Sequence, residues 1–180
     1  MSPDVLNATA SIVSSIVIIF TALAAFRQIR HMRSANEIQA FSAMVERWSA
    51  PQTVAALDFL YGAEDLMRDP AFASELRQHP LPERPRTMLP ILSLLEEIGT
   101  LVYLSIISER AIMINYATSI LRIWHLTEPA IRVLRETQGA GSYQMFEDLA
   151  TRAQRWTTRD EPRLLRSLGR MPVVAKTDIP

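Results

Sequence analysis

Two adjacent carboxylates, Glu96 and Glu97, lie in the middle of an otherwise apolar segment and are the residues best placed for chemistry. Neighbouring residues of an α-helix point in directions about 100° apart, so one carboxylate can face a core while the other faces water. A buried carboxylate needs a partner, which Arg122 or Arg132 of a neighbouring helix could supply. We interpret the pair as structural, because an acid–base catalyst also needs a second reacting group and a pocket, which no motif here predicts.

The three histidines are poorly placed to bind a metal. His31 lies among arginines and His79 in a proline-rich stretch, whereas His125 precedes Glu128 by three residues, which places both on one helical face. A di-iron site in a helical bundle uses two Glu-x-x-His motifs and two further glutamates. Here the order of the two residues is reversed and a second such histidine is missing. We therefore predict no metal and no cofactor, and we expect His125 to pair with Glu128.

The composition argues against several other kinds of site. There is no cysteine, which excludes thiolate metal sites, iron–sulfur clusters and cysteine nucleophiles. No GxSxG, GxGxxG or GxxxxGK[ST] motif occurs. The 19 basic and 19 acidic side chains give a net charge of zero, which argues against a general nucleic-acid binder. The sequence predicts no catalytic residue, and we expect a protein that is not an enzyme.

Three tryptophans, Trp48, Trp124 and Trp156, lie near the ends of expected helices. We expect them to close the ends of a core, with stacking on a ligand as the alternative. After Trp156 the chain is rich in arginine and proline, which predicts a weakly ordered tail or a segment that touches anionic lipid or an acidic partner. The candidate buried polar or interaction residues are Glu96, Glu97, Trp124, His125, Arg132 and Trp156.

The elements that position these residues begin with an uncharged N-terminal segment. No charged residue occurs from Val5 to Phe26, and a helix of that length, at about 1.5 Å per residue, matches the roughly 30 Å hydrocarbon core of a bilayer. A cleaved signal peptide would need a basic segment before the apolar core, and here the flank holds Asp4. A buried helix of a soluble protein is the other alternative. We predict a transmembrane anchor.

Basic residues follow the uncharged segment directly, at Arg27, Arg30 and Arg33. Because basic flanks stay in the cytoplasm, we predict a single-pass protein of the cell inner membrane with its N-terminus outside and its C-terminal domain in the cytoplasm. Small residues four apart, such as Ala10 and Ser14, would let two such helices pair, so a homo-oligomer is an open alternative. The predicted domains are an anchor with a basic turn (1–33), a helical cytoplasmic domain (34–156) and an Arg-rich tail (157–180).

Apolar residues recur at helical spacing through the rest of the chain, and no segment alternates as a half-buried strand does. The sequence therefore predicts an all-α fold, in which the transmembrane helix continues as a stalk to about Trp48 and a cytoplasmic bundle of about five helices follows. The expected helical segments of the bundle are 51–68, 72–76, 87–107, 109–127, 129–139 and 143–156.

Local signals set several of these expected boundaries. Pro129 should interrupt a helix, because proline lacks the backbone donor that a helix interior uses. Ser142 should cap the last helix. Residues 79–90 hold four prolines and are predicted to be an exposed, mobile linker. In the second helix, we expect Val54, Leu57, Leu60 and Tyr61 to face the core.

Several segments in matching order resemble a bacterial family of unknown function. They are RQIRHMR, SAPQTVAALDFLYG, EEIGTLVYLSII, IWHLTEPAIRVLRE and SYQMFEDLATRAQRW, and together with the uncharged segment they extend the resemblance over most of residues 5–156. The resemblance implies one N-terminal transmembrane helix and a small helical cytoplasmic domain. It implies no activity and no catalytic residue.

Three functions are compatible with these features. The leading hypothesis is a membrane-anchored accessory subunit or protein-interaction module, which predicts an exposed apolar groove or patch on the bundle. The alternative is a membrane-bound sensor or regulator that binds a small ligand or lipid within the bundle, with Glu96 or Arg132 as polar anchors. An enzyme would need both glutamates, His125 and Arg132 to converge in one cleft. The expected partners are the lipid bilayer and a protein partner or membrane complex, with no nucleic acid.

Overall fold

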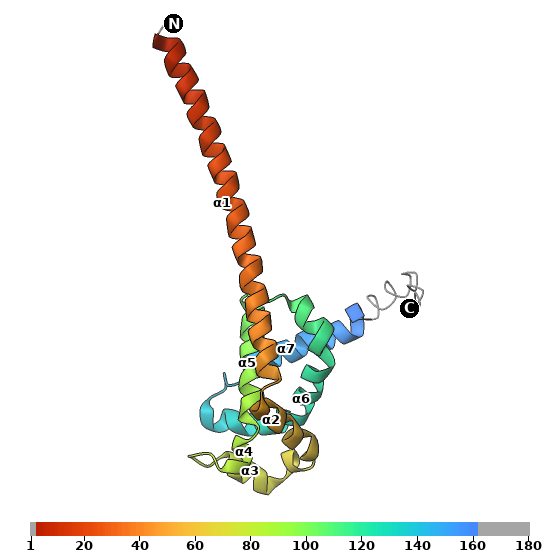
Figure 1. The fold of residues 1–180 in the computed structure, drawn as a ribbon. Coiled ribbons are helices and arrows are strands. Elements are labelled where there is room, and N and C mark those ends of the chain that lie inside the picture. Colours follow the sequence, from red (N-terminus) through yellow and green to blue (C-terminus); the bar gives the residue numbers. More distant parts are fainter. Residues whose placement is uncertain (1–2, 162–180) are drawn as a thin grey trace, which may run out of the picture. The chain divides into compact units, whose positions relative to one another are not determined.

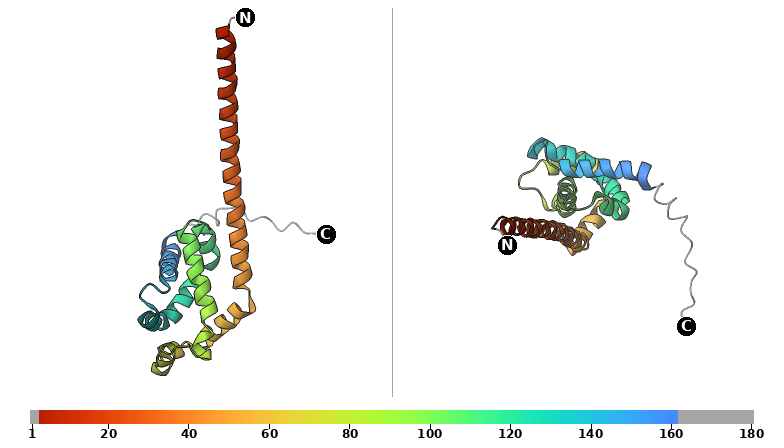
Figure 2. Two further views of the ribbon diagram at one scale, coloured as in Figure 1. Left: turned by 90° about the vertical axis from the view of Figure 1, so that its left-hand side faces the viewer. Right: turned by 90° about the horizontal axis from the view of Figure 1, so that it is seen from above.

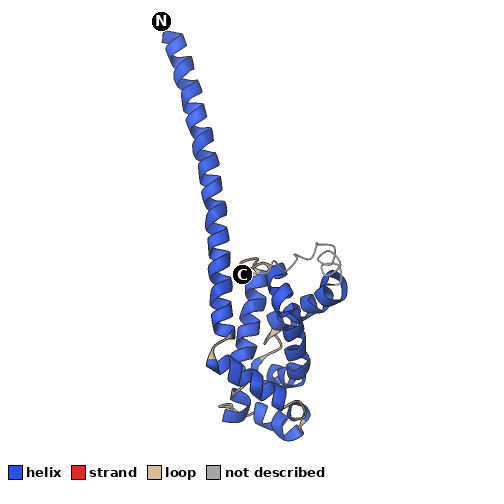
Figure 3. Cartoon of the chain, turned by 45° about the vertical axis from the view of Figure 1, so that its right-hand side comes forward, coloured by secondary structure: helices blue, strands red, loops and turns tan. Residues whose placement is uncertain are grey.

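The structure, a computed structural model, consists of helices and their connections in the part of the chain that it describes, residues 3–161 (Figure 3). The described part of the structure does not include residues 1–2 and 162–180, nor the side chains of residues 3–13, 30, 33 and 34. The elements, most of them labelled in Figure 1, are α1 (Pro3–Trp48), α2 (Pro51–Gly62), η1 (Leu66–Arg68), α3 (Pro70–Leu76), α4 (Glu83–Arg86), α5 (Leu89–Tyr103), α6 (Glu109–Gln138), α7 (Gln144–Arg155) and η2 (Trp156–Asp160). The all-α prediction is confirmed for these residues.

The chain divides into two compact units, and the boundary falls inside α1, between Phe41 and Ser42. As predicted, α1 continues without interruption to Trp48. In the first unit, five consecutive large apolar residues, 16–20, are each about half exposed or more. Since five consecutive residues cover every side of an α-helix, this segment is apolar all round.

Among the described residues, no helix is both long enough and apolar enough to cross a membrane. The predicted span begins at Val5, and the side chains of residues 5–13 lie outside the description, as do those of Arg30 and Arg33. The side chain of Arg27 is described and is exposed. The transmembrane anchor therefore stays a prediction.

The core of the second unit is formed by α5, α6 and α7, with α7 packed against both of the others (Figure 2). Along α7 the buried residues are Phe146, Leu149, Ala150 and Ala153, which is the spacing of one helical face. Full burial of a leucine or phenylalanine side chain contributes about 1.5–3 kcal/mol, so this face fixes α7 on its neighbours. Fully buried residues of the partner helices include Leu92, Leu95, Ile112, Ile120 and Ile131.

The second helix, α2, packs on α5 with a different face from the one predicted. Leu60 is completely buried as expected, but Val54 and Tyr61 are 44% and 41% exposed. The ring of Tyr61 instead lies under the guanidinium of Arg122, 4.3 Å from ring centroid to the arginine carbon. Small residues, Thr53 and Ala56, take the inward positions that the larger residues were expected to fill.

The proline-rich stretch 79–90 is more ordered than predicted. It contains α4, which packs against α3, and both Pro85 and Met88 are buried. Prolines suit the first turn of a helix because their fixed φ matches it and their missing N–H has no partner there anyway. Part of the predicted linker is therefore structure that covers the core.

Pro129 lies inside α6, which continues from Glu109 to Gln138 instead of breaking into two helices. The helix persists because buried side chains flank the proline on both sides, among them Thr127, Ala130 and Ile131. The buried hydroxyl of Thr127 donates to the carbonyl of Ile123 at 2.8 Å, so this polar group is satisfied within the helix. Packing on both sides of Pro129 thus outweighs the one lost backbone hydrogen bond.

The turn between α5 and α6 is tightly held by backbone hydrogen bonds. The helix ends at Tyr103, before the predicted residue 107, where the amide of Ile106 donates to the carbonyl of Leu101 at 2.9 Å. Ser105 has a φ of 56°, the left-handed conformation that commonly ends helices. Ser108 then caps α6 by accepting from the amide of Ala111 at 3.4 Å.

Candidate functional site: an arginine-lined pocket

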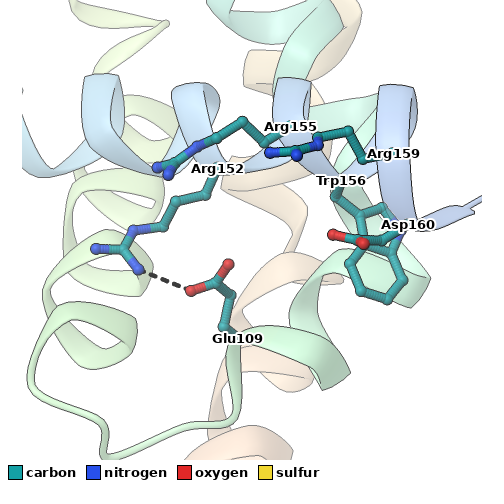
Figure 4. A pocket seen from close by; sticks show the side chains of 6 residues that line it. All are labelled: Glu109, Arg152, Arg155, Trp156, Arg159 and Asp160. Carbon is teal, nitrogen blue, oxygen red and sulfur yellow. Dashed lines mark hydrogen bonds and ion pairs between the residues drawn. The ribbon is translucent and has the colours of Figure 1, made fainter.

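A pocket of about 370 Å³ lies where the end of α7 and η2 face the start of α6 (Figure 4). We call it the α7 pocket, and it is lined by Glu109, Arg152, Arg155, Trp156, Arg159 and Asp160. Three arginines against two acids give its wall a net positive charge. Four of the six residues are exposed, with Arg152 and Trp156 half-buried, so the pocket is accessible from solvent.

Arg152 holds one side of the pocket in place. Its guanidinium donates to Glu109 at 2.7 Å, the pair that Figure 4 draws as a dashed line, and to Asp148 at 2.6 Å. These hydrogen bonds to Asp148 and Glu109 raise the pKa of Arg152 above its already high usual value. Because the ion pair with Glu109 joins α7 to the first turn of α6, this wall is fixed by two helices.

The other two arginines of the pocket differ from Arg152. Among the described residues, neither Arg155 nor Arg159 forms a salt bridge; Arg155 donates only to the carbonyl of Thr151, at 3.4 Å. The two residues are four apart, so two like charges lie on neighbouring turns, which is mildly unfavourable without a counter-charge. Other arginines of this unit do have a carboxylate partner, among them Arg47, Arg77, Arg84, Arg132 and Arg135.

Glu96 is half-buried, but its partner is neither Arg122 nor Arg132, so that prediction is wrong. Its carboxylate accepts from the backbone amides of Phe146 at 2.8 Å and Met145 at 3.3 Å, at the first turn of α7. The first amides of a helix have no acceptor within it and carry partial positive charge, so a carboxylate from another helix satisfies them.

This arrangement replaces the predicted cap at Ser142. The residue before α7 is Tyr143, at a φ of 59°, and its side chain makes no capping hydrogen bond. Burial, and then the negative charge of Glu96, raise the pKa of the Tyr143 phenol above its usual 10.0. Glu96 therefore acts as a cap supplied by α5.

The other predicted polar residues have local, structural partners. Glu97 is exposed and forms an ion pair with Arg47 at the end of α1. Arg132, also exposed, donates to Glu128 at 2.6 Å, so Glu128 is not the partner of His125, which is itself exposed. These side chains do not meet in a common cleft. Within residues described here, no group of three histidine or acidic side chains is placed to hold a metal ion.

The tryptophans divide between the core and the pocket. Trp124 packs edge-on against the buried Phe146, with ring centroids 5.1 Å apart, and Trp48 lies 4.8 Å from Tyr116. Both thus cover the core, as predicted. Trp156 instead lines the α7 pocket, as Asp160 does, and Figure 4 shows its indole on the side away from Glu109.

A family model described as a domain of unknown function, DUF4760, matches residues 14–156. The chain belongs to the DUF4760 family. The predicted resemblance to an uncharacterised family is therefore confirmed. No curated protein and no solved structure matches the chain. The DUF4760 match ends at Trp156, so Arg159 and Asp160 of the pocket lie just beyond it.

Sequence patterns singled out Trp156 and placed Arg159 in a tail expected to be weakly ordered or to touch anionic lipid, but gave no role to Arg152 or Arg155. In the structure, residues 157–160 of that tail belong to η2. A signal was present, because Arg152, Arg155 and Arg159 are spaced three and four apart around Trp156, which puts them on one side of a helix. Because they lie next to an Arg-rich tail, the sequence suggested that they belong to a solvent-exposed segment. Asp148, four residues before Arg152, is a local signal that this arginine has an acidic partner. The ion pair of Arg152 with Glu109 could not be inferred from spacing, because the two residues are 43 positions apart.

Proposed function

We propose that this DUF4760 protein is a single-pass, membrane-anchored accessory subunit or protein-interaction module of the bacterial inner membrane, without catalysis of its own. The proposed anchor is the uncharged segment from Val5 to Phe26, followed by Arg27, Arg30 and Arg33 on the cytoplasmic side. The apolar side chains exposed all round residues 16–20 support this assignment, since water is an unfavourable surrounding for such a helix.

The observation that carries the interaction function is a set of exposed apolar side chains on the α5–α6 turn and the first two turns of α6. We call it the turn patch; it consists of Tyr103, Leu104, Ile106 and Ile114, which are 61%, 58%, 42% and 50% exposed. The neighbouring Ile107 is only 2% exposed, so the turn is anchored in the core while the patch faces outward. Because the backbone of this turn is hydrogen-bonded, the patch is held ready for a partner rather than able to fold inward.

A site-specific photo-crosslinker tests this proposal in native membranes. Placed at Leu104 of the full-length protein, it should trap one protein in stoichiometric yield, and Ile106→Glu should abolish that adduct. The matched control is the same crosslinker at the exposed Gln138, at the opposite end of α6. Equal adducts at both positions, or lipid adducts alone at Leu104, would contradict the interaction function. A self-adduct would identify a homo-oligomer instead.

The anchor and its orientation are tested separately. Because the chain has no cysteine, single cysteines at Ser2 and at Gln138 can be labelled with a membrane-impermeant maleimide in intact cells. The proposal expects reaction at position 2 only, and retention of the protein in membranes washed with alkaline carbonate. Release of the protein into the wash would contradict the proposed membrane anchor. It would not contradict the interaction function, which the crosslinking experiment tests separately.

A regulator that binds a small ligand is the second candidate function, and one observation favours it. The α7 pocket offers positive charge and an indole at the edge of the helical unit. It differs from the ligand site expected from the sequence, because it lies beside α7 and not around Glu96 or Arg132.

A further inference from the structure

Arg155 and Arg159 leave a positive charge in the α7 pocket that no described carboxylate neutralises. Exposed like charges four residues apart weaken a helix by a few tenths of a kcal/mol, so they are not a stabilising device. Arg152 already supplies a cation near the C-terminal end of α7, where it complements the helix dipole and joins Glu109. Two further arginines on the same side of the pocket add no salt bridge to the fold among the described residues, and they leave it with donors for an anion.

We propose that the α7 pocket binds a phosphate ester through Arg155 and Arg159. The guanidinium group binds phosphate with parallel N–H donors, which makes arginine better suited to this anion than lysine. The inference deepens the second candidate function, ligand-dependent regulation, and is independent of partner binding at the turn patch.

The remaining pocket residues restrict the kind of phosphate ester. Glu109 is paired with Arg152, but a carboxylate has more acceptor sites than one ion pair fills, so it can also accept from a ligand hydroxyl. A second acid, Asp160, lines the pocket as well and disfavours ligands with many negative charges. The indole of Trp156 offers a flat apolar surface on the opposite side from Glu109.

The size of the pocket points to a compact ligand. Its volume of about 370 Å³ is at the lower end of the roughly 300–1,000 Å³ range of small-molecule sites. A single phosphate with a hydroxyl-bearing group fits this description, and two sources share that chemistry. One is a soluble sugar phosphate or mononucleotide, and the other is the headgroup of a phospholipid such as phosphatidylglycerol.

Isothermal titration of the full-length protein in non-ionic detergent distinguishes these sources. The soluble probes are glycerol 3-phosphate and adenosine monophosphate, and the lipid probes are short-chain phosphatidylglycerol and phosphatidylcholine. Saturable binding of a soluble probe assigns the site to a metabolite. Binding of phosphatidylglycerol alone, without phosphatidylcholine, assigns it to the lipid headgroup.

Variants connect binding to the pocket. Arg155→Ala and Arg159→Ala should each weaken binding at least tenfold, while Arg68→Ala, which removes an exposed arginine on η1, should leave it unchanged. Trp156→Phe should weaken it less than either arginine variant. The inference is overturned if no probe binds saturably, or if both arginine variants bind as the wild type does. Either failure would leave crosslinking at Leu104 unaffected.

Discussion

The two ends of the α7–η2 segment meet different surroundings. At the N-terminal end, the carboxylate of Glu96 accepts from two backbone amides, and the helix lies directly against α5 at Gly99. At the C-terminal end, Arg155 and Arg159 face a solvent-accessible pocket without a described carboxylate partner. At the first end the two amides are satisfied and the helix is closely packed, whereas at the second end Arg155 and Arg159 are exposed and form no salt bridge among the described residues.

This difference separates residues that stabilise the fold from residues available for binding. Removing any part of a close-packed and fully hydrogen-bonded contact lowers the free energy of unfolding. Exposed, unpartnered charges cost little to remove, so their presence needs another explanation. We therefore expect large losses of stability from substitutions at the N-terminal end, and losses of ligand binding with little change in stability from substitutions of Arg155 and Arg159.

The strongest test of the packed end is Gly99→Ala. A methyl group at this position would overlap the backbone carbonyl of Met145, which cannot rotate away as a side chain can. We expect the free energy of unfolding to fall by about 2–3 kcal/mol, because α7 must shift from α5. Urea titration measures this, and Gly62→Ala is the control, since nothing lies within 4 Å of an added methyl there. Similar losses for both variants would mean that close approach at Gly99 is unimportant.

Glu96→Ala should have the next largest effect. It leaves two amides at the start of α7 without their acceptor, and hydrogen bonds to charged groups contribute about 1.5–3 kcal/mol. Glu97→Ala removes only an ion pair with Arg47 in which both side chains are 48% exposed, and such pairs contribute about 0–1 kcal/mol. Measuring the free energy of unfolding of both variants under identical conditions compares these two adjacent residues directly. Equal losses would contradict the assignment of Glu96 as the cap of α7.

Part of this arrangement could be predicted from the sequence. The all-α fold and the short helix at Pro70 follow from local patterns, since Asp69 caps that helix by accepting from Ala71 at 2.9 Å. Glu96 and Glu97 were expected to have different surroundings, as they do. Their partners could not be predicted, because Phe146 is fifty residues from Glu96 and a backbone amide carries no residue-specific signal.

The errors have a common physical cause, which is that tertiary packing outweighs local preference. Pro129 normally ends a helix, yet α6 continues through it because buried residues on both sides hold the helix on the core. Val54 and Tyr61 are mainly apolar, yet α2 packs on α5 with the face that carries Thr53, Ala56 and Leu60. In both cases the deciding contact is with a segment distant in sequence.

Tyr143 predicts a pH dependence at the packed end. Burial and Glu96 raise the pKa of its phenol above 10.0 in the folded chain, so the unfolded chain releases this proton at a lower pH. The stabilisation is complete below pH 10 and is lost as the pH rises through the folded-state pKa. Tyr143→Phe should therefore lose less stability than the wild type between about pH 9 and 11. Tyr103→Phe, which removes an exposed phenol, is the control, and an identical pH dependence in all three proteins would contradict the prediction.

The smallest effects on stability are expected at the pocket. Arg152→Ala breaks two ion pairs in which the arginine side chain is 26% exposed, and should cost about 1 kcal/mol. Arg155→Ala and Arg159→Ala break no salt bridge, so each should change the free energy of unfolding by less than about 0.5 kcal/mol. Urea titration of the three variants without ligand tests this order. Adding the phosphate ester that binds should then stabilise the wild type but neither Arg155→Ala nor Arg159→Ala, because a ligand stabilises only the folded state that it binds. A loss above 1 kcal/mol for Arg155→Ala without ligand would instead make that arginine a structural residue, and would remove the contrast between the two ends.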